Sequence, residues 1–298
     1  MFPGWLGFSK SHNNWSVRRK RLSDKLGLNF ASKNIPLFIE TAQEELRNLK
    51  EGDRVCLSDL VSEITIAIMT KMLFGEDSPR GIRINYEDEK GRFRDMAFSD
   101  AFKQILEDCE KQYYTVLNQL LPFSWDYNIG SGNRRNRRNA TEVHNKLVTF
   151  LQNSKDKSSL FHQMIVEEGV SLADIMNDLK GALMAGFDTS ARGTTTTIFK
   201  LLKNPEKLNK LKEDLRKRIP VGDQGSKDIA ETLTMDAIND LDFLQYVVKE
   251  GLRMDPPTGG SIDYKTSEDI KLCDAVIPKG AMVAIGITYL HMNPNIWH

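Results

Sequence analysis

The sequence predicts a mostly α-helical protein with a small β region near its end, and three observations support this fold class. Apolar residues recur at helical spacing over most of the 298 residues. One helical pattern runs from 171 to 203 with no proline to interrupt it. Between 262 and 285 the pattern changes to short apolar runs separated by turn residues, which is typical of strands. No repeat and no linker divides the chain, so we expect one domain over 1–298 and no second domain.

The first half of the chain shows six helical patterns. They cover 13–28, 35–49, 58–74, 96–121, 140–151 and 160–168. Ser58 is expected to cap the third of these helices and Gly75 to close it. Residues 55–57 read as a short strand. The charged segment 77–94, which contains proline and glycine, is predicted to be a surface loop.

The second half begins with the long helix over 171–203. Ser171 and Asp174 resemble a capping box at its start, and at ~1.5 Å per residue the helix would be about 50 Å long. Two further helices are predicted over 206–219 and 242–253, with a loop at 220–225 between them. Short strands are then predicted over 262–264, 270–272, 275–277 and 282–285.

Charge and hydropathy exclude several classes of protein. Lysine plus arginine and aspartate plus glutamate both number 41, so there is no global field to attract nucleic acid. Four arginines lie within 134–138, but without flanking aromatic residues a solvated helix start or loop is favoured over a nucleic-acid or membrane-surface patch. No run approaches the ~20 apolar residues that a membrane helix needs. We expect no nucleic-acid partner and no transmembrane segment in this chain.

The cysteines and histidines indicate a reducing compartment and no metal site. Cys56, Cys109 and Cys273 are few, far apart and odd in number, which excludes a disulfide framework or a four-cysteine zinc site. We expect at least two of them to be buried free thiols. The five histidines are scattered, and none has a second ligand at metal-binding spacing.

The middle of the long helix contains the first candidate site. A helix of this length should be buried at its centre, yet Gly186, Asp188 and Thr189 occur there. A buried, unpaired carboxylate costs several kcal/mol. Either a polar group faces Asp188 or its side chain lies on a solvated face, and the spacing leaves both possibilities open. An acid beside an alcohol in an apolar helix could relay protons between a buried cofactor and solvent.

Two further pairs are candidates on spacing alone. Glu250 and Arg253 are three apart on a helix and can form an ion pair, which either fixes orientation or is a surface pair worth ~0.5 kcal/mol or less. Trp15 and Arg19 are four apart, so an aromatic ring and a planar cation share a face suited to a carboxylate. The chain has no P-loop, dinucleotide-binding glycine motif, nucleophile elbow or zinc-protease helix.

Taken in order, these residues resemble the cytochrome P-450 superfamily of haem-thiolate monooxygenases. The resemblance rests on the Ala-Gly-Phe-Asp-Thr-Ser motif at 185–190, Glu-x-x-Arg at 250–253 with its Pro-Pro exit, Trp-x-x-x-Arg at 15–19, Ile-Pro-Lys-Gly at 277–280 and His-x-x-Pro-x-x-Trp at 291–297. It implies that the parent protein inserts one oxygen atom from O2 into a small apolar organic substrate. Electrons would come from NADPH through a reductase or a ferredoxin.

The resemblance also implies roles for single residues. Asp188 and Thr189 would be the catalytic pair that orders water and delivers protons. The cofactor-binding residues would be Trp15 and Arg19 at a haem propionate, with Ala185 and Gly186 letting the long helix pass close to the macrocycle. Glu250 and Arg253 would form a structural ion pair. Residues 258–262 would border the substrate cavity, and 96–121 would form part of its lid.

The family pattern predicts segments that this chain does not contain, so we expect a cytochrome P-450 fold truncated at both ends. The family's cysteine loop, Phe-x-x-Gly-x-Arg-x-Cys-x-Gly, belongs after Trp297. No metal ligand is therefore predicted here, and the chain alone is expected to be inactive, either as a fragment or as a haem-free scaffold or pseudoenzyme. The intact protein is expected to be intracellular, at the endoplasmic reticulum, with membrane contact only through the missing N-terminal region.

Overall fold

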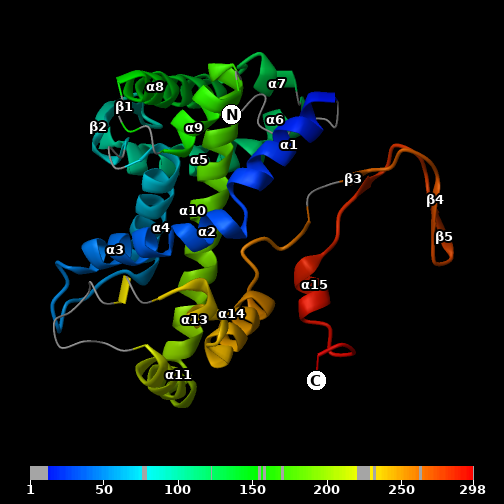
Figure 1. Ribbon diagram of the computed structural model, residues 1–298. Helices are drawn as coiled ribbons and strands as arrows, with labels where there is room; N and C mark the ends of the chain where they lie inside the picture. The colour runs from blue at the N-terminus through cyan, green and yellow to red at the C-terminus, as the bar shows by residue number, and fades with distance from the viewer. Residues whose placement is uncertain are drawn as a thin grey trace. The chain divides into compact units, whose positions relative to one another are not determined.

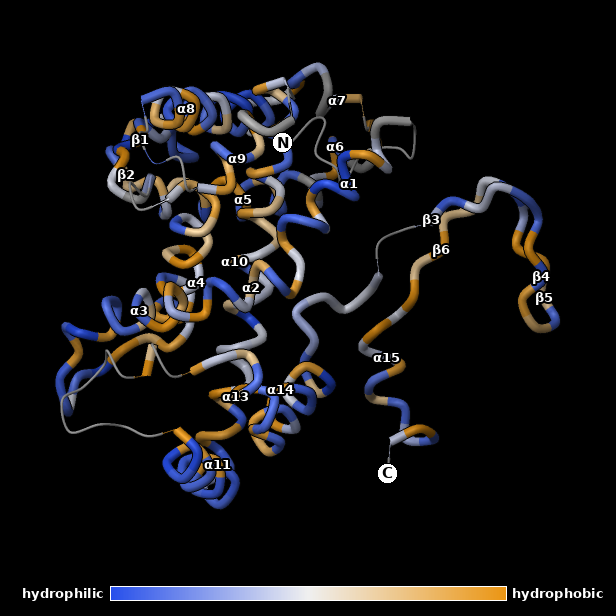
Figure 2. Tube along the Cα trace, viewed as in Figure 1, coloured by the Kyte–Doolittle hydropathy of each residue, from blue (hydrophilic) through white to orange (hydrophobic). Residues whose placement is uncertain are grey.

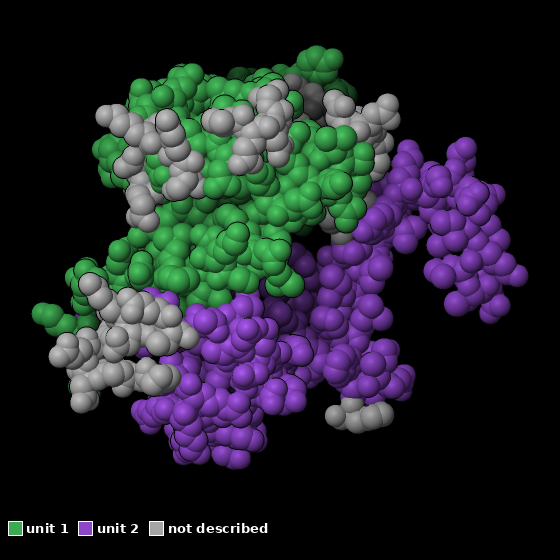
Figure 3. Space-filling model, viewed as in Figure 1, with its two compact units in different colours: residues 1–51, 63–187 green, residues 52–62, 188–298 purple. Residues whose placement is uncertain are grey.

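The computed structural model describes residues 13–75, 79–121, 123–153, 156, 159–168, 171–219, 229–230, 233–261 and 264–297 (Figure 1). These residues form mostly helices, with strands only in small two-stranded sheets. The predicted fold class, mostly α with a small β region, is confirmed. The chain forms two compact units, one of residues 1–51 and 63–187 and the other of residues 52–62 and 188–298 (Figure 3).

The helices of the first unit match the predicted patterns in part, because short helices at 28–33 and 123–126 were not predicted and the helix predicted over 140–151 begins at 131. They are α1 (Asn13–Lys25), α2 (Leu28–Lys33), α3 (Ile35–Leu46), α5 (Phe98–Tyr113), α6 (Val116–Leu120), α7 (Phe123–Asp126), α8 (Ser131–Asn153) and α9 (Leu160–Glu168). Helix α4 (Leu57–Phe74) begins in the second unit and continues in the first. The arginine-rich run lies in the first turns of α8, which confirms a helix start there.

Three local predictions in this region are wrong. The predicted strand at 55–57 does not form, because Leu57 already belongs to α4. For the same reason Ser58 lies inside the first turn and is not the cap. The predicted helix over 96–121 is divided, because its first two residues belong to a strand and Thr115 caps a new helix by accepting a hydrogen bond from the Asn118 backbone N–H.

The prediction of a surface loop over 77–94 is also wrong for residues 83–94, which form strands joined by a tight turn. Strands β1 (Arg83–Glu87) and β2 (Phe93–Ala97) form an antiparallel hairpin. Ile84 and Tyr86 alternate into the core, while Asp88 accepts backbone hydrogen bonds from Lys90 and Arg92 across the turn. Local side-chain bonding to backbone N–H groups is a common way to stabilise such turns. Residues 76–78 lie outside the described part.

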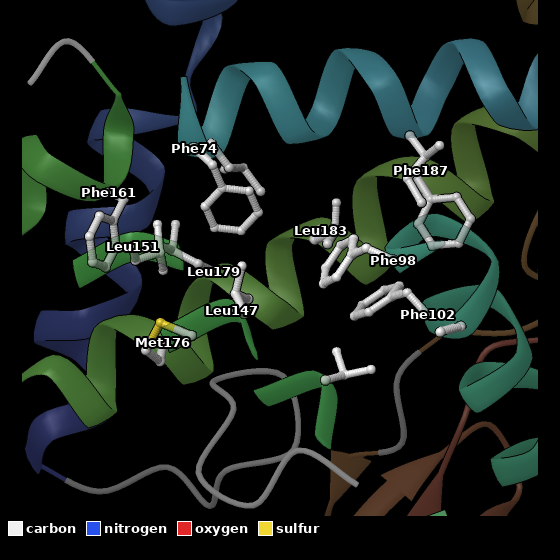
Figure 4. Close-up of a cluster of buried hydrophobic side chains, with 14 of the residues drawn as sticks. Phe74, Phe98, Phe102, Leu147, Leu151, Phe161, Met176, Leu179, Leu183 and Phe187 are labelled. Atoms are coloured by element: carbon white, nitrogen blue, oxygen red, sulfur yellow. The ribbon is translucent and has the colours of Figure 1, made fainter. Parts of the chain in front are cut away.

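The core of the first unit is a cluster of buried apolar side chains from α4, α5, α8, α9 and the first half of α10 (Leu172–Leu202), shown in Figure 4. Phe102 lies at its aromatic centre, with ring centroids 5.8 Å from Phe98 and 6.0 Å from Phe187. Fully burying a side chain of this size contributes about 1.5–3 kcal/mol. This cluster therefore fixes the first half of α10 against α5.

Helix α10 confirms the predicted long helix. Its 31 residues correspond to about 46 Å. The Ser171 hydroxyl accepts a 3.2 Å hydrogen bond from the Asp174 backbone N–H and donates a 2.8 Å bond to the Asp174 carboxylate, so the predicted capping interaction is present. Residues up to Phe187 belong to the first unit and those from Asp188 onward to the second.

The second unit also contains α11 (Pro205–Arg218), α13 (Met235–Asn239), α14 (Asp242–Met254) and α15 (Ile287–His291). Helix α11 is largely hydrophilic (Figure 2). Strand β3 (Tyr264–Lys265) pairs with β6 (Met282–Val283), and β4 (Ile270–Leu272) pairs with β5 (Ala275–Ile277). The strands predicted over 270–272 and 275–277 are confirmed, residue 264 of the strand predicted over 262–264 lies in β3, and the strand predicted over 282–285 ends at Val283. The predicted loop at 220–225 lies outside the described residues. Helices α13 and α15 were not predicted.

No helix in the described part of the chain has both the length and the apolar character needed to cross a bilayer.

Candidate functional site

Trp15 and Arg19 share a face of α1, as their spacing predicts. The Arg19 guanidinium carbon lies 5.1 Å from the centroid of the Trp15 ring, within the range of a cation–π contact. Arg19 is exposed and Trp15 is partly buried. The guanidinium therefore remains accessible to an anionic ligand while the ring limits its freedom.

Helix α1 is held by a contact that sequence reasoning missed. Arg18 donates hydrogen bonds to both carboxylate oxygens of Asp178 on α10, with an Nε–Oδ2 distance of 3.1 Å. Asp178 is completely buried. The hydrogen bond to Asp178 raises the pKa of Arg18, while desolvation raises the pKa of Asp178 and Arg18 opposes that rise. The two residues are 160 positions apart, so no local spacing could have indicated the pair.

Ala185 and Gly186 occupy neighbouring positions on α10 with different surroundings. A Cβ at Gly186 would lie 2.4 Å from Cε of Met69 on α4. The space left by the missing side chain is thus filled by a methionine of the same unit. Ala185 is exposed. The expectation that the centre of the helix is buried is therefore wrong for this face, although Leu183 and Phe187 on the other face are buried.

Asp188 lies where water reaches it. Its side chain is 50% exposed, and Oδ2 is 3.7 Å from Nε of Arg192, one turn further along α10. Ion pairs of this kind at a surface are worth about 0.3–0.5 kcal/mol. Of the two possibilities that the sequence left open, the solvated face describes this carboxylate.

Thr189 lines an apolar groove in the second unit. The groove has a volume of about 490 Å³ and runs between α10, α11 and α14. Its lining consists of Thr189, Ser190, Gly193, Thr194, Thr197, Ile198, Leu201, Leu211, Leu244, Val247, Val248, Leu252 and Pro257. Sequence reasoning did not predict this groove, although the broad apolar face of α14 was its signal. A shape of this volume with few polar groups suits an apolar organic ligand.

Glu250 and Arg253 form the ion pair that their spacing predicts. Arg253 donates two hydrogen bonds of 2.7 Å to the two carboxylate oxygens of Glu250 and a third, 2.8 Å bond to the backbone carbonyl of His291. Its guanidinium carbon is also 5.0 Å from the centroid of the Trp297 ring. Glu250 is 54% exposed, so the pair is not buried. The contacts of Arg253 with His291 and Trp297 connect α14 to the segment that contains α15.

The cysteines differ from expectation. Cys56 and Cys273 are exposed, and only Cys109 is partly buried, so the expectation of at least two buried thiols is wrong. The Cys109 sulfur accepts a 3.8 Å contact from the Asn136 amide, and burial raises the pKa of this thiol to about 11. Among the described residues, no cluster of three or more histidine, cysteine, aspartate or glutamate side chains could hold a metal ion.

The described residues thus form a mostly helical protein with an exposed arginine beside an aromatic ring on α1 and an apolar groove that includes Thr189. The cytochrome P450 family model matches residues 6–298, and the chain belongs to this family. Its members are haem-dependent monooxygenases.

Similar proteins come from animals and plants. A probable cytochrome P450 313a4 of Drosophila melanogaster is 24% identical over 97% of this chain and 59% of its own length. The ultra-long-chain fatty acid omega-hydroxylase of Homo sapiens is 26% identical over 98% of this chain and 57% of its own length. Geraniol 8-hydroxylase of Catharanthus roseus is 22% identical over 84% of this chain and 49% of its own length. The chain thus spans between 49% and 59% of the length of these relatives.

The residues present fit one part of a haem group and not another. The exposed Arg19 guanidinium beside the Trp15 ring suits a propionate. An axial thiolate needs a cysteine with a lowered pKa. Burial raises the pKa of Cys109 instead, and Cys56 and Cys273 lie exposed at the surface. None of the three cysteines fits the axial position.

Proposed function

We propose that this chain is part of a haem-dependent monooxygenase that inserts one oxygen atom from O2 into an apolar organic substrate. The carrying observation is the position of two consecutive residues on α10. Thr189 lines an apolar groove, and the Asp188 side chain beside it is half exposed to water. An acid in contact with solvent, followed by an alcohol that lines an apolar groove, is an arrangement that can pass protons inward.

The proposed roles follow from these surroundings. Asp188 takes up protons from solvent, and Arg192 limits the directions in which its carboxylate can turn. Thr189 holds the proton or a water molecule beside the groove that it lines. Haem, when bound, supplies the activation of oxygen. Trp15 and Arg19 hold a propionate, and the small side chain of the exposed Ala185 leaves room for the macrocycle, whereas the space beside Gly186 is taken by Met69.

Glu250 and Arg253 take no part in the proposed proton transfer. The bidentate pair and the bond to the His291 carbonyl hold α14 and α15 in one arrangement. We assign them a structural role. On this proposal, residues 1–298 form a single partial cytochrome P450 domain, from just before the Trp-x-x-x-Arg helix to the His-x-x-Pro-x-x-Trp stretch.

The substrate class is supported by the groove and by two relatives. The lining of the groove is mainly aliphatic, and the names of two similar proteins state hydroxylation of a fatty acid and of geraniol. We propose a small apolar substrate, with electrons from NADPH through a reductase or a ferredoxin. We also propose that the intact protein is located at the endoplasmic reticulum membrane and that nucleic acid is not a partner.

A second candidate function has its own observation. Because none of the three cysteines fits an axial thiolate, the 298-residue chain alone is proposed to be inactive. A haem-free scaffold or a pseudoenzyme derived from the family would share this property. Sequencing the transcript beyond the codon for His298 separates the two functions. A downstream Phe-x-x-Gly-x-Arg-x-Cys-x-Gly loop supports the enzyme, and a stop codon supports the scaffold.

If that loop is present, the long form allows a direct test of Thr189. Thr189→Ala should uncouple NADPH consumption from product formation and increase the release of hydrogen peroxide. Thr196→Ala is the matched control, because its hydroxyl bonds to backbone carbonyls of α10 and does not line the groove. Unchanged coupling in Thr189→Ala would remove this residue from the mechanism.

A further inference from the structure

We propose that Asp178 is a positioning residue for α1. By holding Arg18, it fixes the rotation of this helix and so the direction in which the Arg19 and Trp15 side chains face an anionic ligand. This inference rests on the proposed function, because it concerns the residues assigned there to a propionate. No spacing in the sequence connects these residues, and the relation appears only in the folded first unit.

The contact has the geometry of an orienting clamp. Arg18 uses Nε and Nη2 on the two oxygens of one carboxylate, a fork-to-fork arrangement with a single preferred direction. Asp178 is completely buried and the Arg18 side chain is only 11% exposed. A buried bidentate pair cannot swing as a surface pair can.

Helix α1 has other contacts besides this pair. Leu22 and Leu26 pack against the apolar cluster of the first unit, and Trp15, Ser16, Arg21 and Lys25 also have interaction partners. Apolar packing turns one face of the helix to the core but tolerates small rotations, because hydrophobic contact is non-directional. The charged contact does fix the rotation, because neighbouring helical residues are separated by a constant step of about 100° around the axis. Locking Arg18 therefore sets the direction of Arg19.

The charges around Asp178 favour the same arrangement. Arg21, one turn after Arg18 on α1, also stabilises the charged form of this carboxylate, whereas Asp174 on α10 opposes it. A buried ion pair gives little net stability, because desolvation offsets the attraction. The main effect of the Arg18–Asp178 pair is therefore to orient α1. An arginine that receives a ligand carboxylate, such as Arg19, needs a fixed orientation.

The test compares two porphyrins that differ only in their carboxylates. Zinc protoporphyrin IX and its dimethyl ester are titrated against the 298-residue chain, with fluorescence reporting the dissociation constant. Asp178→Asn should weaken the diacid by about 10-fold or more, a size typical of lost orienting contacts, and leave the ester unchanged. Arg19→Gln should give the same pattern. Equal weakening of both porphyrins, or of neither, would overturn the positioning role.

Asp95→Asn is the matched control. Asp95 also pairs with an arginine, Arg83, in the first unit, but that pair is exposed on both sides. It should leave both dissociation constants unchanged. A selective loss of diacid binding in Asp95→Asn would show that any carboxylate-to-amide change has this effect and would overturn the assignment to Asp178.

A second readout separates this inference from the proposed cofactor. If the parent chain binds neither porphyrin, the cofactor proposal fails, and the orientation of α1 is then decided by fluorine NMR of chain labelled with 5-fluorotryptophan. Asp178→Asn should shift the Trp15 resonance, because α1 turns when the Arg18 contact is lost, and Asp95→Asn should leave it in place. An unchanged Trp15 resonance in Asp178→Asn would overturn the inference.

If Asp178→Asn destabilises the fold, a double variant in which both Arg18 and Asp178 are replaced by apolar residues separates stability from orientation. Replacing a buried ion pair by apolar side chains of similar volume often preserves stability. Arg18→Met with Asp178→Leu should therefore restore the melting temperature lost in Asp178→Asn without restoring the preference for the diacid. Recovery of both properties would reduce Asp178 to a merely structural residue.

Discussion

The hydroxyl oxygen of Thr197 lies 2.1 Å from the point that a Cβ on Gly251 would occupy. The two residues lie against each other where α10 and α14 face each other in the second unit. Thr197 is β-branched and its hydroxyl donates a 2.7 Å hydrogen bond to the Gly193 carbonyl, so it cannot turn away without loss. The glycine is therefore required for close packing rather than for backbone freedom.

Gly251→Ala should destabilise the second unit by about 1–3 kcal/mol, the usual cost of overpacking, despite the higher helix propensity of alanine. Urea unfolding measures this change. Gly260→Ala is the control, since its nearest contact, at 3.6 Å, is ordinary. A Gly251→Ala protein as stable as the parent would mean that α14 can move away from α10 without cost.

Tyr86→Phe should cost about 1–2 kcal/mol, because the phenol donates a 2.7 Å hydrogen bond to the buried Asp108 carboxylate. Burial, reinforced by Asp108, raises the pKa of Tyr86, so the folded phenol stays neutral where an unfolded one ionises, near pH 10. The folded state then holds the extra proton, and stability falls as pH rises above that value. Melting curves between pH 8 and pH 11 should show this fall in the parent and much less of it in the variant. Tyr264→Phe, at an exposed tyrosine, should change neither property.

The Glu250 carboxylate should titrate below the ordinary glutamate value. Hydrogen bonds from Arg253 lower its pKa, so the stabilisation is present above about pH 4.3 and is lost as pH falls through the lowered folded pKa. Carbon-13 NMR of the side-chain carboxyl measures the titration directly. Arg253→Lys should return it toward the ordinary value, because lysine cannot form the bidentate contact. An unshifted titration in the parent would mean that the pair is absent in solution.

Thiol chemistry should separate the three cysteines. Cys56 and Cys273 are exposed and should react readily with iodoacetamide at pH 8, while Cys109 should react slowly because burial raises its pKa to about 11. Mass spectrometry of tryptic peptides gives the three rates. Fast alkylation of Cys109 would contradict its burial.

Reduction under carbon monoxide tests the same cysteines as ligands. The 298-residue chain, mixed with haem and reduced, should lack the thiolate-type Soret band. Cys109→Ser is the control variant, and its spectrum should match that of the parent. Appearance of the thiolate band in the parent would show that one of the three cysteines binds the iron.

Periodicity predicted the helices well because burial of one face is encoded locally. The apolar spacing at Leu179, Leu183 and Phe187 was sufficient to place α10. The β1–β2 hairpin was missed because Ile84 and Tyr86 provide only two inward positions among charged residues, and a pattern that short resembles a loop. Helix α15 is only five residues long and has no buried residue, so it left no periodic signal.

The candidate site was predictable only in part, for a related reason. The pairs Trp15 with Arg19 and Glu250 with Arg253 lie within one helical turn, so their spacing determined their contact. The partners that anchor these pairs are distant in sequence. Asp178 for α1 and the His291 carbonyl for α14 are set by tertiary packing, which no local pattern contains.

The two short ladders of the second unit affect how the isolated chain behaves in solution. Each has two strands of two or three residues, and Val276 and Met282 on them are 65% and 63% exposed. Two-stranded sheets are marginal by themselves, and open strand edges with apolar side chains recruit strands from other molecules. Self-association should therefore increase steeply with protein concentration, as light scattering can show, and Val276→Lys should slow it without changing the helical content.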